Sequence, residues 1–374
     1  AGGRRLAWRF VRSLTRRSPA NQFEVRRQLL NGVVEVLYFS IPALVSFAIA
    51  SPWALLTPVA CWRGPMMQSM LVSGHYVFPY TQQYVHTLPL VYPLLQMAFW
   101  GLGPGVVIAG LSALLLWSPI SRRGLPSQRH VSWLWMTFTF TIIGSLWVKF
   151  PRYMLPLYPW WIAWAAAAFV SWWRRLGGAI RWLALFALVL PTAILGLAQV
   201  GLYGAPHPWL AASQHLYAAL DSSSVVTVEA WDHPLPVPLS GHDPTALTQV
   251  TLPVYAEEDV DKAQRLTTAL DGDVVVLASR RGYGALSREP ERYRRTLMWY
   301  TRLLGRHNVL TFTRCPRIGP LALTDDPLAD AGLPASTTLA ERCGTPYAFR
   351  LPRLDESYRV YDAPLTLLVR LDPQ

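Results

Sequence analysis

One short loop carries the side chains best suited to bind an anion. The segment "VKFPRYMLPLYPW" (148–160) places Lys149, Arg152 and Tyr153 between two strongly apolar stretches. Its prolines predict a bend, because proline has no amide hydrogen to give to a helix. Cations beside a phenol are typical of phosphate sites, where charge-assisted hydrogen bonds reach the phosphate oxygens. The alternative is that both cations only extend from a helix end toward the polar surface of a bilayer.

A second polar region lies in the long segment 51–93. "SGHYVFPYTQQYVHTLPLVYP" (73–93) concentrates hydrogen-bonding and aromatic side chains, namely His75, Tyr80, Gln82, Gln83, Tyr84, His86 and Tyr92. Amides and imidazoles of this kind can bind sugar hydroxyls, so we predict sugar or acceptor contacts here. The competing interpretation is an aromatic belt at a membrane surface.

A third candidate follows an expected strand. "VEAWDHPLP" (228–236) places Asp232 and His233 just after a β-branched run, where α/β folds often hold functional groups. Asp232 is therefore a further candidate for a sugar or acceptor contact. Two other interpretations stay open: a turn cap, and a separate enzyme using Asp232 with His233, although no nucleophile or metal cluster accompanies them.

The charge of the chain divides near Gly204. Residues 1–203 contain 17 basic residues, two glutamates (Glu24 and Glu35) and no aspartate, whereas residues 204–374 contain 17 basic and 20 acidic residues. The net charge of +12 therefore belongs to the apolar first half. There it indicates membrane topology and argues against nucleic acid as a partner.

The fold class expected is an α-helical multispan membrane bundle followed by an extracytoplasmic α/β domain. A bilayer core requires roughly 20 apolar residues per helix. Five segments come close to this length. The chain would then divide into a basic cytoplasmic segment 1–30, a transmembrane region 31–203 with an outer loop 51–93, and an extracytoplasmic domain 204–374. The five expected spans are 31–50, 94–117, 131–148, 155–172 and 182–203.

The arginines orient these spans. Segments 1–29, 118–130 and 173–181 are rich in arginine, whereas loop 51–93 has only Arg63. Since positive residues favour the cytoplasmic side, the amino terminus is expected inside, and both loop 149–154 and residues 204–374 outside. The location expected is the inner or plasma membrane of a bacterial cell.

Residues 204–374 show an alternation of strands and helices. Strands are expected at 222–231, 272–279, 308–313 and 364–371, and helices at 257–270 and 289–304. This pattern favours an α/β domain with a mostly parallel sheet. The three cysteines lack the spacing of a metal site, and Cys315 with Cys343 is the one pairing that the sequence suggests for a disulfide. We interpret Ala1 as an internal or processed start.

The chain resembles the bacterial relatives of the dolichyl-phosphate-mannose–protein mannosyltransferases, a group that includes the aminoarabinose transferases. The nearest resemblance is to members from Chloroflexi-type bacteria that carry an outer carboxy-terminal domain. The matching stretches run in order along the chain: "SPWALL" (51–56), "YTQQYVHTLPLVYPLLQMAFWGLGPG" (80–105), "KFPRYMLPLYP" (149–159), "EAWDHPLP" (229–236), "LPVYAEEDVDKAQRL" (252–266), "VVVLASRRGYGALSREPERYRRT" (274–296) and "DESYRVYDAPLTLLVR" (355–370).

The resemblance implies a C-type membrane glycosyltransferase. Such an enzyme takes a sugar from a polyprenyl-phosphate carrier, its substrate, and transfers it to an acceptor hydroxyl at the outer membrane face without a cofactor or metal. Lys149, Arg152 and Tyr153 match the cationic pocket that holds the carrier phosphate in this family.

The chain departs from this family at the catalytic base. The family's aspartate lies in the first outer loop, whereas residues 1–203 contain no aspartate. An acceptor hydroxyl needs a base within hydrogen-bond reach. We therefore assign no catalytic residue, and expect the carboxy-terminal portion of such an enzyme, completed by missing amino-terminal spans. The alternative is a catalytically silent membrane subunit whose outer domain binds a partner or a glycan.

Overall fold

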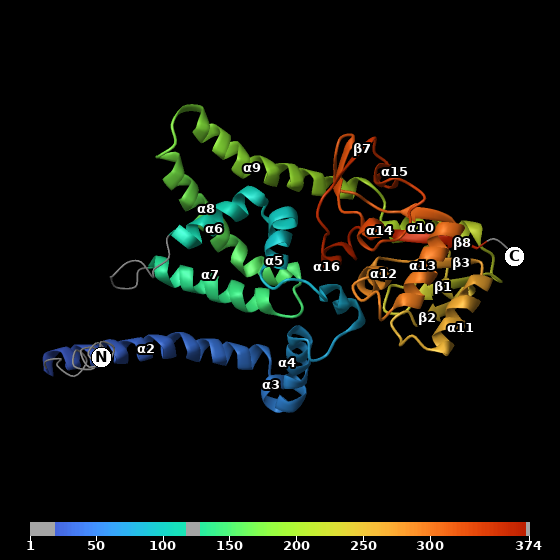
Figure 1. Ribbon diagram of the computed structural model, residues 1–374. Helices are drawn as coiled ribbons and strands as arrows, with labels where there is room; N and C mark the ends of the chain where they lie inside the picture. The colour runs from blue at the N-terminus through green and yellow to red at the C-terminus, as the bar shows by residue number, and fades with distance from the viewer. Residues whose placement is uncertain (1–18, 117–127, 372–374) are drawn as a thin grey trace, which may run out of the picture. The chain divides into compact units, whose positions relative to one another are not determined.

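The computed structural model describes residues 19–116 and 128–371 and divides the chain into two compact units that meet between Ser69 and Met70 (Figure 1). The basic residues of segment 1–18, with Arg122 and Arg123, lie outside the described residues. The first unit holds α2 (Pro19–Ala50), α3 (Trp53–Leu56) and most of α4 (Pro58–Ser73). Loop 51–93 is therefore largely helical in its first half.

The second unit begins with an all-helical part that leads into the carboxy-terminal domain (residues 204–374). In chain order its elements are η1 (Pro79–Tyr84), α5 (Val91–Gln96), the π-helix η2 (Met97–Gly101), α6 (Pro104–Leu116), α7 (Gln128–Ser145), η4 (Pro151–Leu157), α8 (Tyr158–Trp173), α9 (Gly178–Val200) and η5 (Gly201–Gly204).

The expectation of five membrane spans is not supported. Two helical ranges are long and apolar enough to cross a bilayer, Pro151–Trp173 and Gly178–Ala219, the second of which begins with α9. The described residues contain three further apolar helices that are shorter, Val36–Ala50, Pro104–Leu115 and Val131–Ser145. A helix rises 1.5 Å per residue, so 15 residues cover about 22 Å of a core that is about 30 Å thick.

The expected span 94–117 fails for a local reason. Gly103 has a φ of +86°, and Pro104 follows it, so the helix stops and restarts there. A side chain at Gly103 would meet Thr192 of α9, whose hydroxyl donates to the carbonyl of Leu102 at 2.6 Å. The break is thus built into the contact between this segment and α9, which apolar composition alone does not reveal.

The helices of the second unit pack through small residues. Gly110 of α6 lies against Trp161 of α8, where an added Cβ would come within 2.2 Å of the indole nitrogen. Gly105 similarly lies against the backbone of α9 at Ala187. Glycine allows such close approach between apolar helices. Around these contacts a core forms from Met97, Leu102, Val107, Ala113, Met136, Met154, Leu157, Trp161, Trp164 and Ala168.

The carboxy-terminal domain contains the expected α/β sheet. Five strands lie in the order β2-β1-β3-β8-β4: β1 (Val225–Glu229), β2 (Thr248–Leu252), β3 (Val274–Leu277), β4 (Asn308–Phe312) and β8 (Thr366–Arg370). The strand predictions at 222–231, 272–279, 308–313 and 364–371 are confirmed. β1 is parallel to β2 and β3, and β8 runs antiparallel between β3 and β4, so the sheet is mixed with four strands in one direction.

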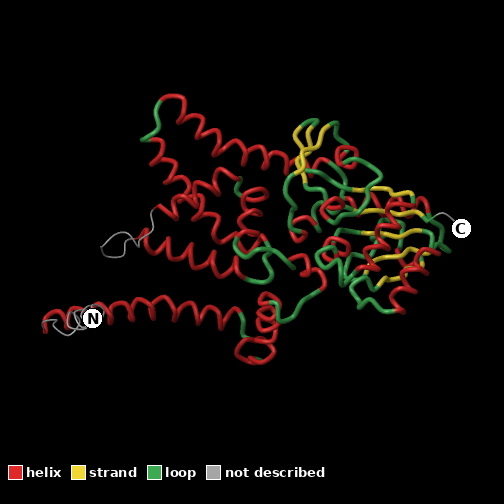
Figure 2. The backbone as a smooth tube through the Cα atoms, viewed as in Figure 1, coloured by secondary structure: helices red, strands yellow, loops and turns green. Residues whose placement is uncertain are grey.

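Helices cover both faces of this sheet, whose strands are drawn in yellow in Figure 2. Val275 and Leu277 pack with α11 (Val260–Thr268), α12 (Arg281–Leu286) and α13 (Arg294–Arg306), whereas Val274 and Val276 pack with α10 (Pro208–Ala219). Successive side chains of a strand point to opposite faces, so the run "VVVL" is buried on both sides. The helix predictions at 257–270 and 289–304 are confirmed, the second beginning later than expected.

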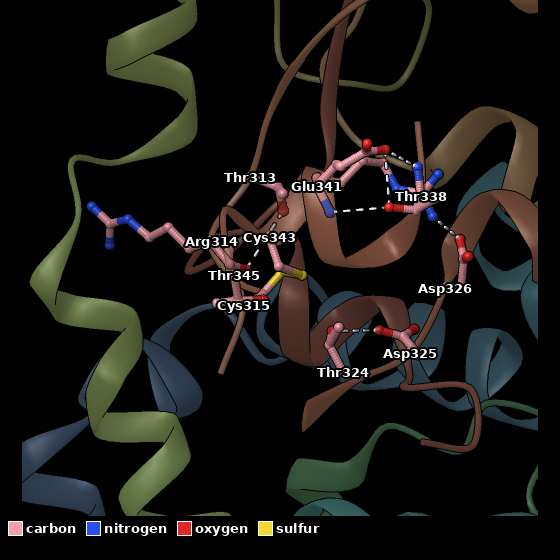
Figure 3. Close-up of a disulfide and its surroundings, with 12 residues drawn as sticks. Thr313, Arg314, Cys315, Thr324, Asp325, Asp326, Thr338, Glu341, Cys343 and Thr345 are labelled. Atoms are coloured by element: carbon pink, nitrogen blue, oxygen red, sulfur yellow. Dashed lines mark hydrogen bonds and ion pairs between the residues drawn. A yellow bond between two sulfur atoms is a disulfide. The ribbon is translucent and has the colours of Figure 1, made fainter. Parts of the chain in front are cut away.

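A smaller sheet that the sequence did not predict follows. Its strands are β5 (Arg317–Ile318), β6 (Leu321–Thr324) and β7 (Tyr347–Arg350), and the remaining short elements are η6 (Pro244–Ala246), η7 (Ala269–Asp271), α14 (Pro327–Asp330), α15 (Leu339–Cys343) and α16 (Glu356–Arg359). A disulfide joins Cys315, just after β4, to Cys343 at the end of α15 (Figure 3). The pairing that the sequence suggested is therefore present.

The disulfide is expected to stabilise the carboxy-terminal domain. It closes a loop across a sequence separation of 28, for which the chain-entropy model gives about 3–4 kcal/mol. Replacing both Cys315 and Cys343 with serine should lower the free energy of unfolding by this amount, measured by pulse proteolysis in urea. The matched control is Cys61→Ser, which removes an exposed, unpaired cysteine and should leave the transition unchanged.

Candidate functional site

Lys149 is buried at the end of the segment that follows α7. Its side chain is 4% exposed, and its ammonium donates to the Thr87 hydroxyl at 3.2 Å and to the Trp147 carbonyl at 3.1 Å. Burial lowers the pKa of this ammonium. Within residues 19–116 and 128–371 no carboxylate forms an ion pair with it, and an ammonium has three N–H donors. Lys149 is thus a buried cation suited to an external anion.

The acceptor of Lys149 is held in place by an unusual backbone. His86 and Leu90, on either side of Thr87, have φ values of +58° and +61°. Left-handed conformations of non-glycine residues are costly and cluster at functional sites. The amide of Leu90 donates to the carbonyl of Gly144 at 2.9 Å, which ties this loop to the end of α7. The two loops that the sequence singled out are therefore in contact.

Arg152 lies in the same segment but is exposed. Its guanidinium lies 4.1 Å from the ring centroid of Phe150 and 5.7 Å from that of Tyr153. In the described part of the chain it makes these ring contacts without a hydrogen bond or an ion pair. The Phe150 ring also contacts Tyr84, over which Lys149 lies at 5.9 Å. Phe150, Tyr84 and Tyr153 thus form one aromatic cluster. The cations of Lys149 and Arg152 both lie over its rings.

The predicted sugar-contact residues divide into two groups. Gln82 and Gln83 are buried, and their amides bind the carboxy-terminal domain: the Gln82 amide donates to the Tyr293 hydroxyl at 3.0 Å, and the Gln83 oxygen accepts from the Glu356 amide at 3.0 Å. A sugar would have to replace these bonds. His75 and His86 are exposed, and His75 is hydrogen-bonded to the Ser73 hydroxyl at 2.7 Å. Sugar contact by these residues stays a prediction.

Further bonds extend this contact between the loop and the carboxy-terminal domain, which we call the seam. The Tyr92 hydroxyl donates to Asp355 at 2.7 Å, the Gln96 amide donates to the Arg353 carbonyl at 2.8 Å, and the Trp100 indole donates to the Pro352 carbonyl at 3.1 Å. The seam places the polar loop and the carboxy-terminal domain at the same end of the helices. The turn after α8, with Arg174 and Arg175, lies at the opposite end of α8 (Figure 1).

Asp232 lies at the carboxyl ends of the parallel strands β1 and β3. One carboxylate oxygen accepts from the amide and the hydroxyl of Ser279, both at 2.8 Å, and the other accepts from the His233 amide at 2.8 Å. The His233 ring stacks on Trp209 at 4.5 Å. The carboxylate and the imidazole thus have different partners, and the Asp232 carboxylate links the loop after β1 to the loop after β3. Sugar or acceptor contact by Asp232 stays a prediction.

This edge of the sheet is the point where the strand order reverses, since β1 lies between β2 and β3. Ligands of α/β folds commonly bind at such points. Trp231 is exposed there with a φ of +66°, and its ring contacts Phe78 of the helical part. Arg281 lies over the rings of Tyr80 and Tyr361, at 5.7 Å and 5.3 Å. Tyr80 is thus brought to the same edge as Asp232.

Glu229 is the most unusual acid at this edge. It is 3% exposed, and one carboxylate oxygen accepts a bond from the Tyr300 hydroxyl while the other has no partner in the described part of the chain. Burial, together with the charge of Asp232, raises its pKa well above the usual value. Gly282 is required beside it, because an added Cβ would lie 2.3 Å from the Glu229 carboxylate.

The raised pKa predicts a pH dependence. Folding favours the protonated acid, so this contribution to stability is full below about pH 4.3 and is lost as the pH rises through the higher folded pKa of Glu229. Glu229→Gln should remove that decline while keeping the Tyr300 bond. Urea midpoints of the carboxy-terminal domain between pH 5 and 8 test this. A slope as steep in the variant as in the natural protein would contradict the assignment.

A buried charge network below this edge was missed by the sequence analysis. The Arg280 guanidinium donates to Asp325 at 2.5 Å and to Glu356, and the Arg359 guanidinium donates to Asp325 at 2.5 Å. All four side chains are at most 6% exposed. The arginines were visible in "SRRGYG" and "ESYRV", but no pattern in the sequence joins them to Asp325.

No group of three or more histidine, cysteine or acidic side chains in the described residues is arranged to hold a metal ion. Comparison of the chain with protein-family models, with curated proteins and with solved structures found no match. The chemistry of the candidate site therefore rests on its own geometry.

Proposed function

We propose that the chain is part of a membrane glycosyltransferase that holds a polyprenyl-phosphate carrier at the outer face of a bacterial membrane. The observation that carries the proposal is Lys149, a buried ammonium without a carboxylate partner among the described residues. Arg152 adds an exposed guanidinium in the same loop. A carrier phosphate would receive charge-assisted bonds from both.

The side of the membrane is also part of the proposal. The seam joins residues 82–100, which contact the Lys149 loop, to the carboxy-terminal domain. This domain contains a disulfide. Disulfides persist in oxidising compartments, and arginine-rich turns favour the cytoplasm. Both arguments support an extracytoplasmic domain with the phosphate loop beside it.

In a transfer reaction these cations would act on the leaving phosphate. Negative charge increases on the carrier phosphate as the bond to the sugar breaks, so fixed cations stabilise the transition state more than the bound substrate. The acceptor hydroxyl would lose its proton to a base from outside residues 1–203, because these contain no aspartate and their two glutamates, Glu24 and Glu35, lie in or next to the basic amino-terminal segment that is expected on the cytoplasmic side.

A transfer assay tests this proposal in the membranes of the cell that makes the protein. Arg152→Ala should reduce transfer from a polyprenyl-phosphate sugar about a hundredfold. Arg174→Ala removes a cation at the opposite end of α8 and should leave transfer unchanged. Normal transfer in both Arg152→Ala and Lys149→Ala would count against a phosphate site in this loop.

The absence of aspartate from residues 1–203 favours a second candidate, a catalytically silent subunit whose carboxy-terminal domain binds a partner or a glycan. A stable, stoichiometric complex without transferase activity would support that function. Recovery of transferase activity in the purified complex would favour the enzyme.

A further inference from the structure

A pocket lies where the end of α9 meets the smaller sheet and α16. Its volume is about 100 Å³, and it is partly open to solvent. It is separate from the Lys149 loop and from the sheet edge at Asp232. The side chains that define its chemistry are Gln199, Tyr203, Thr324, Tyr358, Arg359 and Asp362.

The walls of this pocket belong to packed elements. Ala198 of α9 is fully buried against Leu323, Leu351 and Leu354. Gly201 begins η5 directly against β5, where an added Cβ would lie 2.7 Å from the carbonyl of Arg317. The pocket is therefore formed before any ligand arrives, which lowers the ordering cost of binding.

The cation in the pocket wall is already neutralised. The Arg359 guanidinium donates to Asp325 at 2.5 Å, to the Ala363 carbonyl at 2.7 Å and to the Thr313 hydroxyl at 3.3 Å. Asp362, in contrast, is exposed and has no hydrogen bond or ion pair with the residues that the structure describes. Of the two charged side chains that line the pocket, Asp362 is thus the one without a partner among the described residues, and a carboxylate favours a cation over a phosphate.

Two phenol rings accompany this carboxylate. Tyr203 and Tyr358 line the same pocket as Asp362. Burial raises the pKa of Tyr358, and the Tyr203 phenol and the Asp362 carboxylate raise it further. Aromatic faces beside a carboxylate attract an ammonium through cation–π and ionic contacts. Tyr203 follows the end of α9, a candidate membrane helix, and tyrosines are enriched at the depth of lipid headgroups.

We propose that this pocket binds a primary ammonium group. The group is carried either by an ethanolamine phospholipid or by a soluble amine, and Asp362, Tyr203 and Tyr358 contact it. The proposal does not depend on glycosyl transfer or on the Lys149 loop.

The test uses the whole chain in nanodiscs of phosphatidylglycerol, which lacks an ammonium. Phosphatidylethanolamine is added to one series and putrescine to another, and hydrogen exchange is followed in peptides that cover 197–204 and 356–363. Protection by the lipid alone identifies a headgroup site, and protection by putrescine identifies a soluble-amine site. Protection by neither would overturn the proposal.

Variants separate specific binding from general effects of charge. Asp362→Asn should raise the concentration for half-maximal protection about tenfold, and Tyr358→Leu should raise it in the same direction. Asp271→Asn removes an exposed aspartate from the end of η7 and should change nothing. Protection that Asp362→Asn leaves intact would contradict the assignment. Lys149→Met should not alter the response, so this result stands apart from the phosphate site.

Discussion

Replacing Lys149 with methionine is expected to weaken binding of a polyprenyl phosphate about a hundredfold. Methionine keeps the length of the apolar stem but removes the charge. Truncating one partner of a buried, hydrogen-bonded charge pair costs roughly 2–5 kcal/mol, and about 2.8 kcal/mol corresponds to a factor of a hundred. The dissociation constant in nanodiscs measures this effect directly.

Lys262 provides the matched control for this variant. It is also a buried lysine, 2% exposed, and donates to the carbonyls of Val254 and Ala256 at 2.8 and 2.9 Å. Lys262→Met should leave carrier binding unchanged, provided that proteolysis shows the domain still folded. Equal losses in Lys149→Met and Lys262→Met would indicate that both lysines support the fold and that neither binds phosphate.

Replacing Asp325 with asparagine is expected to cause the largest loss of stability. Asp325 is fully buried and accepts from both Arg280 and Arg359 at 2.5 Å. In the variant, the guanidiniums of Arg280 and Arg359 stay buried, and Glu356 is the one carboxylate left in the network to balance them. Breaking a buried pair by removing one partner costs about 3–5 kcal/mol. Urea unfolding of the carboxy-terminal domain at pH 7 measures the change.

The pH dependence that Asp325 gives to the stability of the natural protein follows from the same charges. Burial alone would raise the pKa of Asp325, but the two guanidiniums outweigh it and hold the pKa below its usual range. The stabilisation is therefore present above about pH 3.9 and is lost as the pH falls through the lower folded pKa.

The control for Asp325→Asn is Asp261→Asn, which breaks an exposed pair with Arg265 and should cost less than about 1 kcal/mol. A similar small loss for Asp325→Asn would contradict the network's role.

Much of the carboxy-terminal domain was predictable because its core strands are continuous β-branched runs. "VVVL" of β3 and "TLLVR" of β8 are buried on both faces, so their apolar composition identified them. β2, "TQVTL", was missed because four of its five residues are exposed and its polar side chains resemble a loop. The number of membrane spans in the first half of the chain was overestimated, because composition counts apolar residues without detecting a helix break such as the one at Gly103.

The candidate site was predictable in its residue types and not in its contacts. The cluster of Lys149, Arg152 and Tyr153 was visible as a local pattern. The hydroxyl that binds Lys149 is 62 residues away at Thr87, and the acceptor's position depends on left-handed backbone at His86 and Leu90. The glutamines were predicted to bind sugar hydroxyls, and the sequence did not indicate that their amides would also bond to the carboxy-terminal domain, because these partners lie more than 200 residues away along the chain.

The most direct test of the phosphate site compares two lipids that differ only in the phosphate. Polyprenyl phosphate and the corresponding polyprenol are titrated into the protein in nanodiscs. We predict that the phosphate lipid binds at least tenfold more tightly, and that a variant with both Lys149→Met and Arg152→Ala loses this preference. Equal affinity for the two lipids, or a preference that survives in the double variant, would contradict a phosphate site in this loop.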